Sequence, residues 1–209
     1  MKNKMVKTQE LTSNGQDILR VTLSQKDFDL PFKIIGSNKV AFLDVSGQAD
    51  LIEHMADLLV EQMKEAGLEF DTILNPVSKS NALAHAIAIR WMKAVNPAMT
   101  STVVARKAKP GEHHMVEAEY KSVTTNGFQT LYLTEDDAEN LEGKKILLVD
   151  DVYGAGGTTR ALEELIAQAK AMKAGHVVCA AEKQPELPED LIYLYDLPSY
   201  PVKDQDLED

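Results

Sequence analysis

The sequence predicts an α/β fold built on a parallel sheet that helices cover on both faces. Short apolar runs alternate with amphipathic helical segments, and the links between them are short. The run KKILLVDD at 144–151 shows no polar alternation, which is typical of a strand buried on both faces. Because ligands of such sheets bind beyond the carboxyl ends of the strands, functional residues are expected at 74–81, 105–110, 149–159 and 181–185.

The composition fits one globular domain and argues against several kinds of partner and binding site. The chain has 209 residues, 44% of them apolar and 26% charged. A net charge of −11 disfavours nucleic acid as a partner. The single cysteine, Cys179, excludes an intrachain disulfide and a cysteine-based zinc site. The sequence shows neither a secretory leader pattern nor an apolar run that could span a membrane, so a cytoplasmic location without a membrane partner is expected.

The first half of the chain is predicted to begin with a loose polar arm over residues 1–17. Residues 50–66 should form a helix, because Leu51, Met55, Leu58, Leu59 and Met63 share one helical face before Gly67. The other elements expected here are strands at 17–23, 39–46, 70–77 and 100–107 and a helix at 81–95.

The second half is predicted to open with a long polar segment at 107–127. An alternating strand follows at 128–133, and the buried strand at 144–151 leads to a helix at 158–175 that stops at Gly175. HVVCAAEK, at 176–183, reads as another buried strand. The acidic residues 203–209 are expected to form a solvated tail.

The stretch VDDVYGAGGTT at 149–159 carries a glycine-rich turn into a helix. Gly154, Gly156 and Gly157 have no Cβ and tolerate positive φ, so the backbone can approach an anion closely. Thr158 and Thr159 are placed to cap the helix, whose N-terminal N–H groups favour a phosphate. This turn is therefore predicted to bind a phosphate group.

Two acids stand directly before the turn. Asp150 and Asp151 can accept hydrogen bonds from sugar hydroxyls or help to hold a metal ion. A ribose phosphate satisfies both features, with hydroxyls for the acids and a 5′-phosphate for the turn. An ordinary glycine turn with a threonine cap fits less well, because paired acids at a buried strand end would be costly.

Three other phosphate or acid motifs do not fit. A receiver domain needs many more residues after its acidic pair than follow Asp150. An ATPase strand of this type needs an upstream G-x-x-x-x-G-K-[ST] loop, which the chain lacks. A dinucleotide fingerprint needs a different glycine spacing and an acid about 20 residues later.

The strand, the acid pair and the Gly/Thr loop resemble the ribose-phosphate signature of type I phosphoribosyltransferases. The family loop more often reads T-G-G-T, where this chain has Ala155-Gly156-Gly157-Thr158. The RK…PG segment at 106–111, the stretch EAEYKSVTTNGFQTLYL at 117–133 and CAAEK at 179–183 resemble adenine and xanthine enzymes of this family. The likeness covers roughly residues 70–185. It implies a central parallel five-stranded sheet flanked by helices, in a single domain over 1–209 whose hood comes from about 1–35 and 185–209.

The resemblance also implies roles for individual residues. The 5′-phosphate loop would comprise Gly154, Ala155, Gly156, Gly157, Thr158 and Thr159. The pyrophosphate site would comprise Ser78, Lys79, Ser80, Arg106, Lys107 and Lys109. Glu182 and Lys183 would face the nucleobase. The catalytic residues would be Asp150, Asp151, Lys79 and Arg106, with Mg²⁺ held by the two aspartates partly through water.

The segment that starts at Lys109 is expected to act as a flexible lid, because excluding water prevents hydrolysis of the ribosyl donor. His113 and His114 lie in it and fit a loop or phosphate-contact role better than a metal site, since no third ligand accompanies them.

The reaction implied is transfer of 5-phosphoribosyl from phosphoribosyl pyrophosphate (PRPP) to a purine base, as in purine salvage, and adenine is favoured. Xanthine or another base, and a non-catalytic regulatory protein that binds PRPP, are the alternatives. Purine-operon repressors of that second kind carry an added DNA-binding domain, which is not evident in this sequence. A homodimer is expected.

Overall fold

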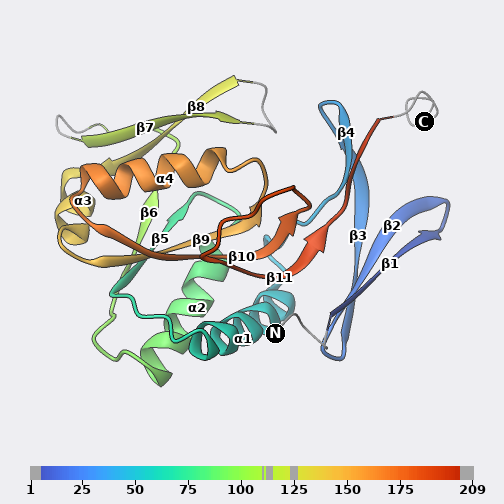
Figure 1. Ribbon diagram of the computed structural model, residues 1–209, viewed down its shortest axis with the longest axis horizontal. Helices are drawn as coiled ribbons and strands as arrows, with labels where there is room; N and C mark the ends of the chain where they lie inside the picture. The colour runs from blue at the N-terminus through green and yellow to red at the C-terminus, as the bar shows by residue number, and fades with distance from the viewer. Residues whose placement is uncertain (1–5, 110, 112–114, 123–126, 203–209) are drawn as a thin grey trace.

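A computed structural model describes residues 6–109, 111, 115–122 and 127–202 (Figure 1). Within these residues a five-stranded sheet forms the centre of the molecule, and all its neighbouring strands run parallel. Its strands, in spatial order, are β11 (Leu191–Leu197), β10 (Met172–Glu182), β9 (Lys145–Tyr153), β5 (Thr72–Pro76) and β6 (Thr102–Ala105). The predicted parallel five-stranded sheet is confirmed.

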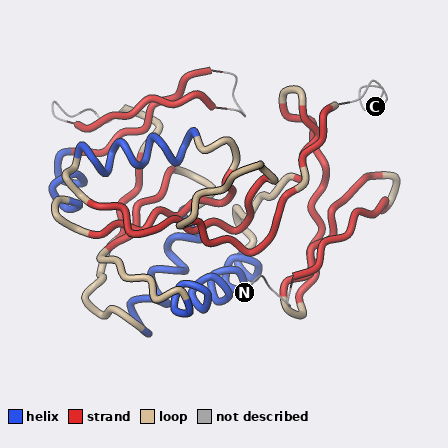
Figure 2. The backbone as a smooth tube through the Cα atoms, viewed as in Figure 1, coloured by secondary structure: helices blue, strands red, loops and turns tan. Residues whose placement is uncertain are grey.

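Helices cover both faces of this sheet (Figures 1 and 2). On one face lie α1 (Ala49–Glu65) and α2 (Asn81–Ala94), and on the other α3 (Glu135–Leu141) and α4 (Gly157–Gln168). In β9, Leu147 and Val149 join the core under α1 and α2, while Ile146 and Leu148 join the core under α4. Successive side chains of a strand point to opposite faces, so a strand between two apolar layers has no polar alternation.

A second sheet forms the hood and is antiparallel (Figure 1). Its strands, in spatial order, are β1 (Val6–Ser13), β2 (Gln16–Leu23), β3 (Lys26–Ile35), β4 (Asn38–Ala41) and β12 (Ser199–Pro201). Strands from both halves of the chain thus share this sheet, but β11 (Leu191–Leu197), which falls in the range 185–209 expected in the hood, belongs to the central sheet. Strand β4 is shorter than the predicted strand at 39–46.

The prediction of a loose arm over 1–17 is wrong for residues 6–17, which form β1 and the start of β2; residues 1–5 lie outside the described part. Strand β1 is largely exposed and therefore lacks an apolar pattern. The register of the hairpin is set by its backbone ladder and by the turn at Asn14 and Gly15, both of which have positive φ. An Asn-Gly pair is a strong hairpin signal, and it was available in the sequence.

The last part of the central sheet also differs from expectation. Helix α4 ends at Gln168 rather than at 175, because Lys170 takes a left-handed conformation (φ 53°) and Met172 already begins β10. Gly175 lies inside β10 beside a β-bulge. The fifth parallel strand is β11, which was not predicted from the sequence.

The strand predicted at 128–133 forms as β8 (Gly127–Thr134), which pairs with β7 (Met115–Ser122) in a separate hairpin. Helix α3 was not predicted, although Thr134 and Asp137 form a capping box at its start. The predicted elements at 17–23, 50–66, 70–77, 81–95, 100–107 and 144–151 are present with small shifts of their ends.

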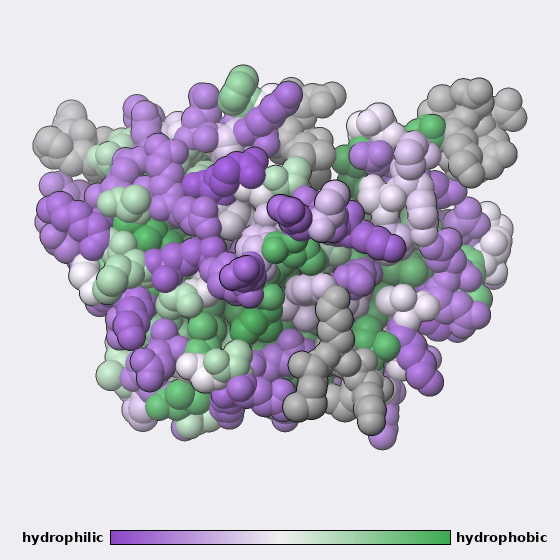
Figure 3. Space-filling view, viewed as in Figure 1, coloured by the Kyte–Doolittle hydropathy of each residue, from purple (hydrophilic) through white to green (hydrophobic). Residues whose placement is uncertain are grey.

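Hydrophilic side chains cover most of the face in Figure 3, and apolar side chains appear there in small groups. Across the described residues no helix combines the length and the apolar character needed to cross a membrane. The predicted tail at 203–209 and the residues Pro110, His113 and His114 lie outside the described part.

Candidate active site

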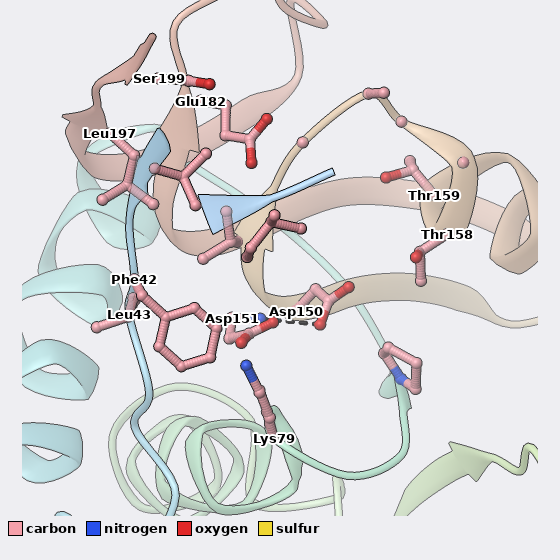
Figure 4. A pocket seen from close by; sticks show the side chains of 18 of the residues that line it. Phe42, Leu43, Lys79, Asp150, Asp151, Thr158, Thr159, Glu182, Leu197 and Ser199 are labelled. Carbon is pink, nitrogen blue, oxygen red and sulfur yellow. Dashed lines mark hydrogen bonds between the residues drawn. The ribbon is translucent and has the colours of Figure 1, made fainter. Parts of the chain in front are cut away.

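A cavity of about 330 Å³ lies between the carboxyl ends of β5, β9 and β10 and the inner face of the hood (Figure 4). Asn38 and Val40 of β4 line it, together with Ser199, which pairs with Val40 across the sheet. The sheet edge supplies the other wall, where the sequence predicted functional residues. The hood was expected, but its residues in the cavity were not predicted.

The loop between β9 and α4 lines the cavity, and all six predicted phosphate-binding residues, Gly154 to Thr159, take part. Gly156 has φ +75°, and a Cβ on Gly157 would lie 2.9 Å from the backbone oxygen of Lys121. Both positions therefore require glycine. The loop reaches its conformation because these residues have no side chain.

Gly156 is the N-cap of α4, and no side chain caps this helix. The expectation that Thr158 or Thr159 would cap it is wrong, since both lie within its first turn. The N–H groups of that turn are therefore available to an anion, and the helix dipole favours one there. The Tyr120 hydroxyl donates a hydrogen bond to Gln129 Oε1 (2.8 Å) beside this turn.

Asp150 and Asp151 line the cavity at the end of β9 (Figure 4). The Asp151 N–H donates to Asp150 Oδ1 at 2.9 Å. Burial raises the pKa of Asp150 well above its usual value, and the neighbouring charge of Asp151 raises it further, whereas the charge of Lys107 acts in the opposite direction. Hydroxyl donors or a cation from a ligand would favour the ionised form of this carboxyl group.

The two aspartates fit a magnesium ion that is shared with a substrate. Among the described residues, no three His, Cys, Asp or Glu side chains lie together as metal ligands. Magnesium characteristically binds one or two carboxylates and completes its shell with water and substrate phosphates. Asp150 and Asp151 supply that number of carboxylates.

On the opposite side of the cavity, the loop after β5 contributes Val77, Ser78 and Lys79. The Lys79 ammonium lies 4.3 Å from the centroid of the Phe42 ring, on the cavity wall (Figure 4). Ser80 does not line the cavity: its hydroxyl is buried and donates to the Pro76 carbonyl oxygen at 2.7 Å, which stabilises the loop.

Of the three cations predicted to bind pyrophosphate after β6, only one lines the cavity. Lys107 lines the cavity, whereas Arg106 and Lys109 do not belong to its lining. The Arg106 guanidinium pairs with Asp137 of α3, and its backbone pairs with Tyr132 of β8. Lys109 is exposed. The structure therefore brings Lys79 and Lys107 together at the cavity and places the other two outside it.

Of the two residues predicted to face a base, only one lines the cavity. Glu182, at the end of β10, lines the cavity. Lys183 is exposed and is absent from the lining, although its N–H donates to the Leu197 carbonyl oxygen. Apolar residues of the hood, of the segment after β4 and of β11 also line the cavity, namely Ile35, Val40, Phe42, Leu43 and Leu197.

Comparison with known proteins identifies one family and several relatives. The family described as "Phosphoribosyl transferase domain" matches residues 43–201. Adenine phosphoribosyltransferase from Mycoplasma capricolum is 26% identical over 73% of this chain and 84% of its own length. The enzyme of the same name from Petrotoga mobilis is 29% identical over 64% and 69%. The purine biosynthesis repressor PurR of Bacillus subtilis is 26% identical over 85% of this chain and 60% of the repressor.

Solved structures agree on the fold. Adenine phosphoribosyltransferase from Thermoanaerobacter pseudethanolicus superposes with a TM-score of 0.59 at 20% identity, covering 73% of this chain and 84% of that one. The Saccharomyces cerevisiae enzyme, crystallised with an imino-altritol bisphosphate and adenine, gives 0.58 at 16% identity over 90% and 93%. Because the family match spans most of the chain, this protein belongs to the phosphoribosyltransferase family.

Proposed function

We propose that this phosphoribosyltransferase transfers 5-phosphoribosyl from PRPP to a purine base, with adenine favoured, and so produces a nucleoside monophosphate and pyrophosphate. The observation that carries the proposal is the cavity itself. It joins an uncapped helix N-terminus, a pair of carboxylates and two lysines to an apolar slot under the hood. Each of these features matches one part of the two substrates.

The donor is held in two places. The N–H groups of Gly156 to Thr159 bind the 5′-phosphate, and Asp150 and Asp151 accept hydrogen bonds from the ribose hydroxyls. Lys79, Lys107 and Ser78 line the cavity. In this proposal the two lysines bind the leaving diphosphate, and the Ser78 hydroxyl donates to it. A magnesium ion bound by the aspartates and the diphosphate would neutralise the charge of the leaving group.

The chemistry is electrostatic. The reacting ribosyl carbon gains positive character, which the nearby carboxylates stabilise, while the lysines stabilise the departing diphosphate. One of the aspartates accepts the proton that the base loses. Cys179 offers no covalent alternative, because it is buried in the core and its burial raises the pKa of its thiol.

Arg106 and Lys109 keep their proposed role in pyrophosphate binding only if the segment that follows β6 closes over the cavity, since neither lines it in this structure. The proposed lid starts at Lys109, three residues after Arg106. The homodimer and the cytoplasmic location also stay predictions.

In this proposal the purine base packs against apolar residues of the cavity wall, among which are Phe42 and Leu197. The relatives from Mycoplasma capricolum and Petrotoga mobilis are named for adenine, which supports this base over xanthine. A regulatory protein that binds PRPP without turnover is the second candidate, because the PurR match spans 85% of this chain.

A turnover assay separates these functions. PRPP and magnesium are supplied with adenine, hypoxanthine, guanine, xanthine or orotate in turn, and pyrophosphate release is measured. We expect release with adenine at a kcat/KM within the range of about 10⁴–10⁸ M⁻¹s⁻¹ that is typical of enzymes. Binding of PRPP without release on any base would reject the enzyme proposal and favour the regulator.

A further inference from the structure

The first half of the phosphate loop brings no side-chain donor to an anion. Its glycines have no side chain, and Ala155 carries only a methyl group. Hydroxyl groups come only at the start of α4, with Thr158 and Thr159 (Figure 4). An anion at the first half of the loop must therefore be bound by peptide N–H groups, and the direction of these groups decides whether it binds.

The direction of each N–H group is coupled to the carbonyl group of the preceding residue. In a planar trans peptide, the C=O of one residue and the N–H of the next point in opposite directions. A carbonyl group that turned toward the anion would repel it and would also take the next N–H away from it. The loop therefore needs contacts that hold its carbonyl groups away from the cavity.

Two side chains from different elements make such contacts. Gln184, which follows β10, donates a hydrogen bond from its amide nitrogen to the Gly154 carbonyl oxygen. The Arg160 guanidinium, on α4, donates to the next carbonyl oxygen, that of Ala155, at 3.3 Å. Both acceptor residues line the cavity, whereas neither donor belongs to its lining. The two carbonyl groups therefore face away from the cavity, and the N–H groups of Ala155 and Gly156 face into it.

These two N–H groups are available to a ligand. Among the described residues, neither the Ala155 nor the Gly156 N–H has a backbone acceptor. Gly156 is buried, and a buried N–H without a partner costs free energy. A phosphate oxygen would supply the missing acceptor.

We propose that Gln184 and Arg160 are positioning residues of the 5′-phosphate site: they hold two successive carbonyl groups outward and so direct two successive N–H groups at the phosphate. This inference rests on the proposed binding of a 5′-phosphate by the loop, and it adds the two side chains that orient the loop. Gln184 has the larger effect, because its hydrogen bond is partly buried, whereas water competes for the exposed bond of Arg160.

The sharpest variant is Gln184→Met, which removes the donor and keeps the length of the side chain. Titration calorimetry should show a Kd for ribose 5-phosphate raised by roughly 10- to 100-fold, since a hydrogen bond to a charged group is lost when the N–H turns away. The Kd for pyrophosphate with magnesium should stay unchanged, which also shows that the variant is folded.

The matched control is Gln168→Met. The Gln168 amide also donates to a backbone carbonyl oxygen, that of Glu117, at 2.9 Å, but neither residue lines the cavity. This variant should alter neither Kd. In turnover, Gln184→Met should raise the KM for PRPP and leave kcat at saturating PRPP unchanged, because the 5′-phosphate does not react.

Arg160→Met tests the second contact at an exposed position. It should raise the Kd for ribose 5-phosphate by roughly 2- to 10-fold, and the double variant with Gln184→Met should lose more than either single variant. Arg160→Lys keeps a donor and the charge, so it should retain most of the affinity. Lys64→Met removes the same charge from an exposed position of α1 and should leave the Kd unchanged.

The outcomes separate this inference from the proposed function. If the wild-type protein binds no ribose 5-phosphate, the proposed 5′-phosphate site is rejected, and the positioning role with it. If the wild-type protein binds ribose 5-phosphate and Gln184→Met binds it equally well, the positioning role is overturned and the phosphate site stands. Equal losses of affinity for ribose 5-phosphate and for pyrophosphate would also overturn it, because they would show a general disturbance of the fold.

Discussion

Replacing Asp150 and Asp151 together by asparagine should lower kcat by roughly 10²- to 10⁴-fold, because both acid–base assistance and charge stabilisation at the ribosyl centre are lost. Asparagine keeps the size and the hydrogen-bonding oxygen of aspartate, so the loss isolates the negative charge. The measurement is pyrophosphate release at saturating PRPP, magnesium and adenine.

The same variant should be more stable than the wild-type protein at neutral pH. The pKa of Asp150 is raised in the folded state, so its ionisation costs stability as the pH rises through the folded value, and the cost is absent below the unfolded value. Asparagine removes this cost. Chemical denaturation should therefore show a stability gain at pH 7 that shrinks at pH 4.

The matched control is Glu61→Gln with Glu65→Gln, two exposed acids of α1 away from the cavity. It removes the same formal charge and should leave turnover unchanged. If the double asparagine variant turns over substrate at the same rate as this control, the proposed role of the aspartates is refuted.

Gly157→Ala should lower kcat/KM for PRPP by roughly 10- to 100-fold, because small misplacements of a binding group are costly. The added Cβ would meet the Lys121 backbone oxygen at 2.9 Å, and a backbone atom cannot move aside as a side-chain end can. The loop or β7 must shift, and the N–H groups of α4 then leave the phosphate position. Initial rates at varied PRPP measure the effect.

Gly154→Ala, in the same loop, is the comparison variant. Its Cβ would lie 3.5 Å from the nearest atoms, an ordinary contact, and Gly154 has no positive φ. The loss of kcat/KM should therefore be clearly smaller. If both variants lose the same amount of kcat/KM for PRPP, the close approach of Gly157 to the Lys121 backbone oxygen is not the reason for glycine at position 157.

The phosphate loop could be predicted from sequence because one continuous segment carries it. Asp150, Asp151 and the glycines after them are fixed by a strand, a turn and a helix start that follow one another directly. Local rules on glycine and on helix N-termini are sufficient for such a segment. The residue that actually caps the helix, Gly156, was still missed, since a threonine near a helix start is an equally common cap.

The cavity walls that come from distant parts of the chain could not be predicted. Asn38 and Phe42 reach the cavity only because the hood folds over the sheet edge, which no local pattern encodes. Arg106 follows a strand just as expected, but its partner Asp137 belongs to a helix that was not predicted. Glu182 and Lys183 are neighbours, and only the strand register decides which of them faces the cavity.

The most direct test of the central claim is a crystal structure of the protein with ribose 5-phosphate and adenine. The claim predicts the phosphate on the N–H groups of Gly156 to Thr159, the ribose hydroxyls at Asp150 and Asp151, and the purine in the same cavity under the hood. A phosphate bound away from the start of α4, or a base outside the hood, would contradict it.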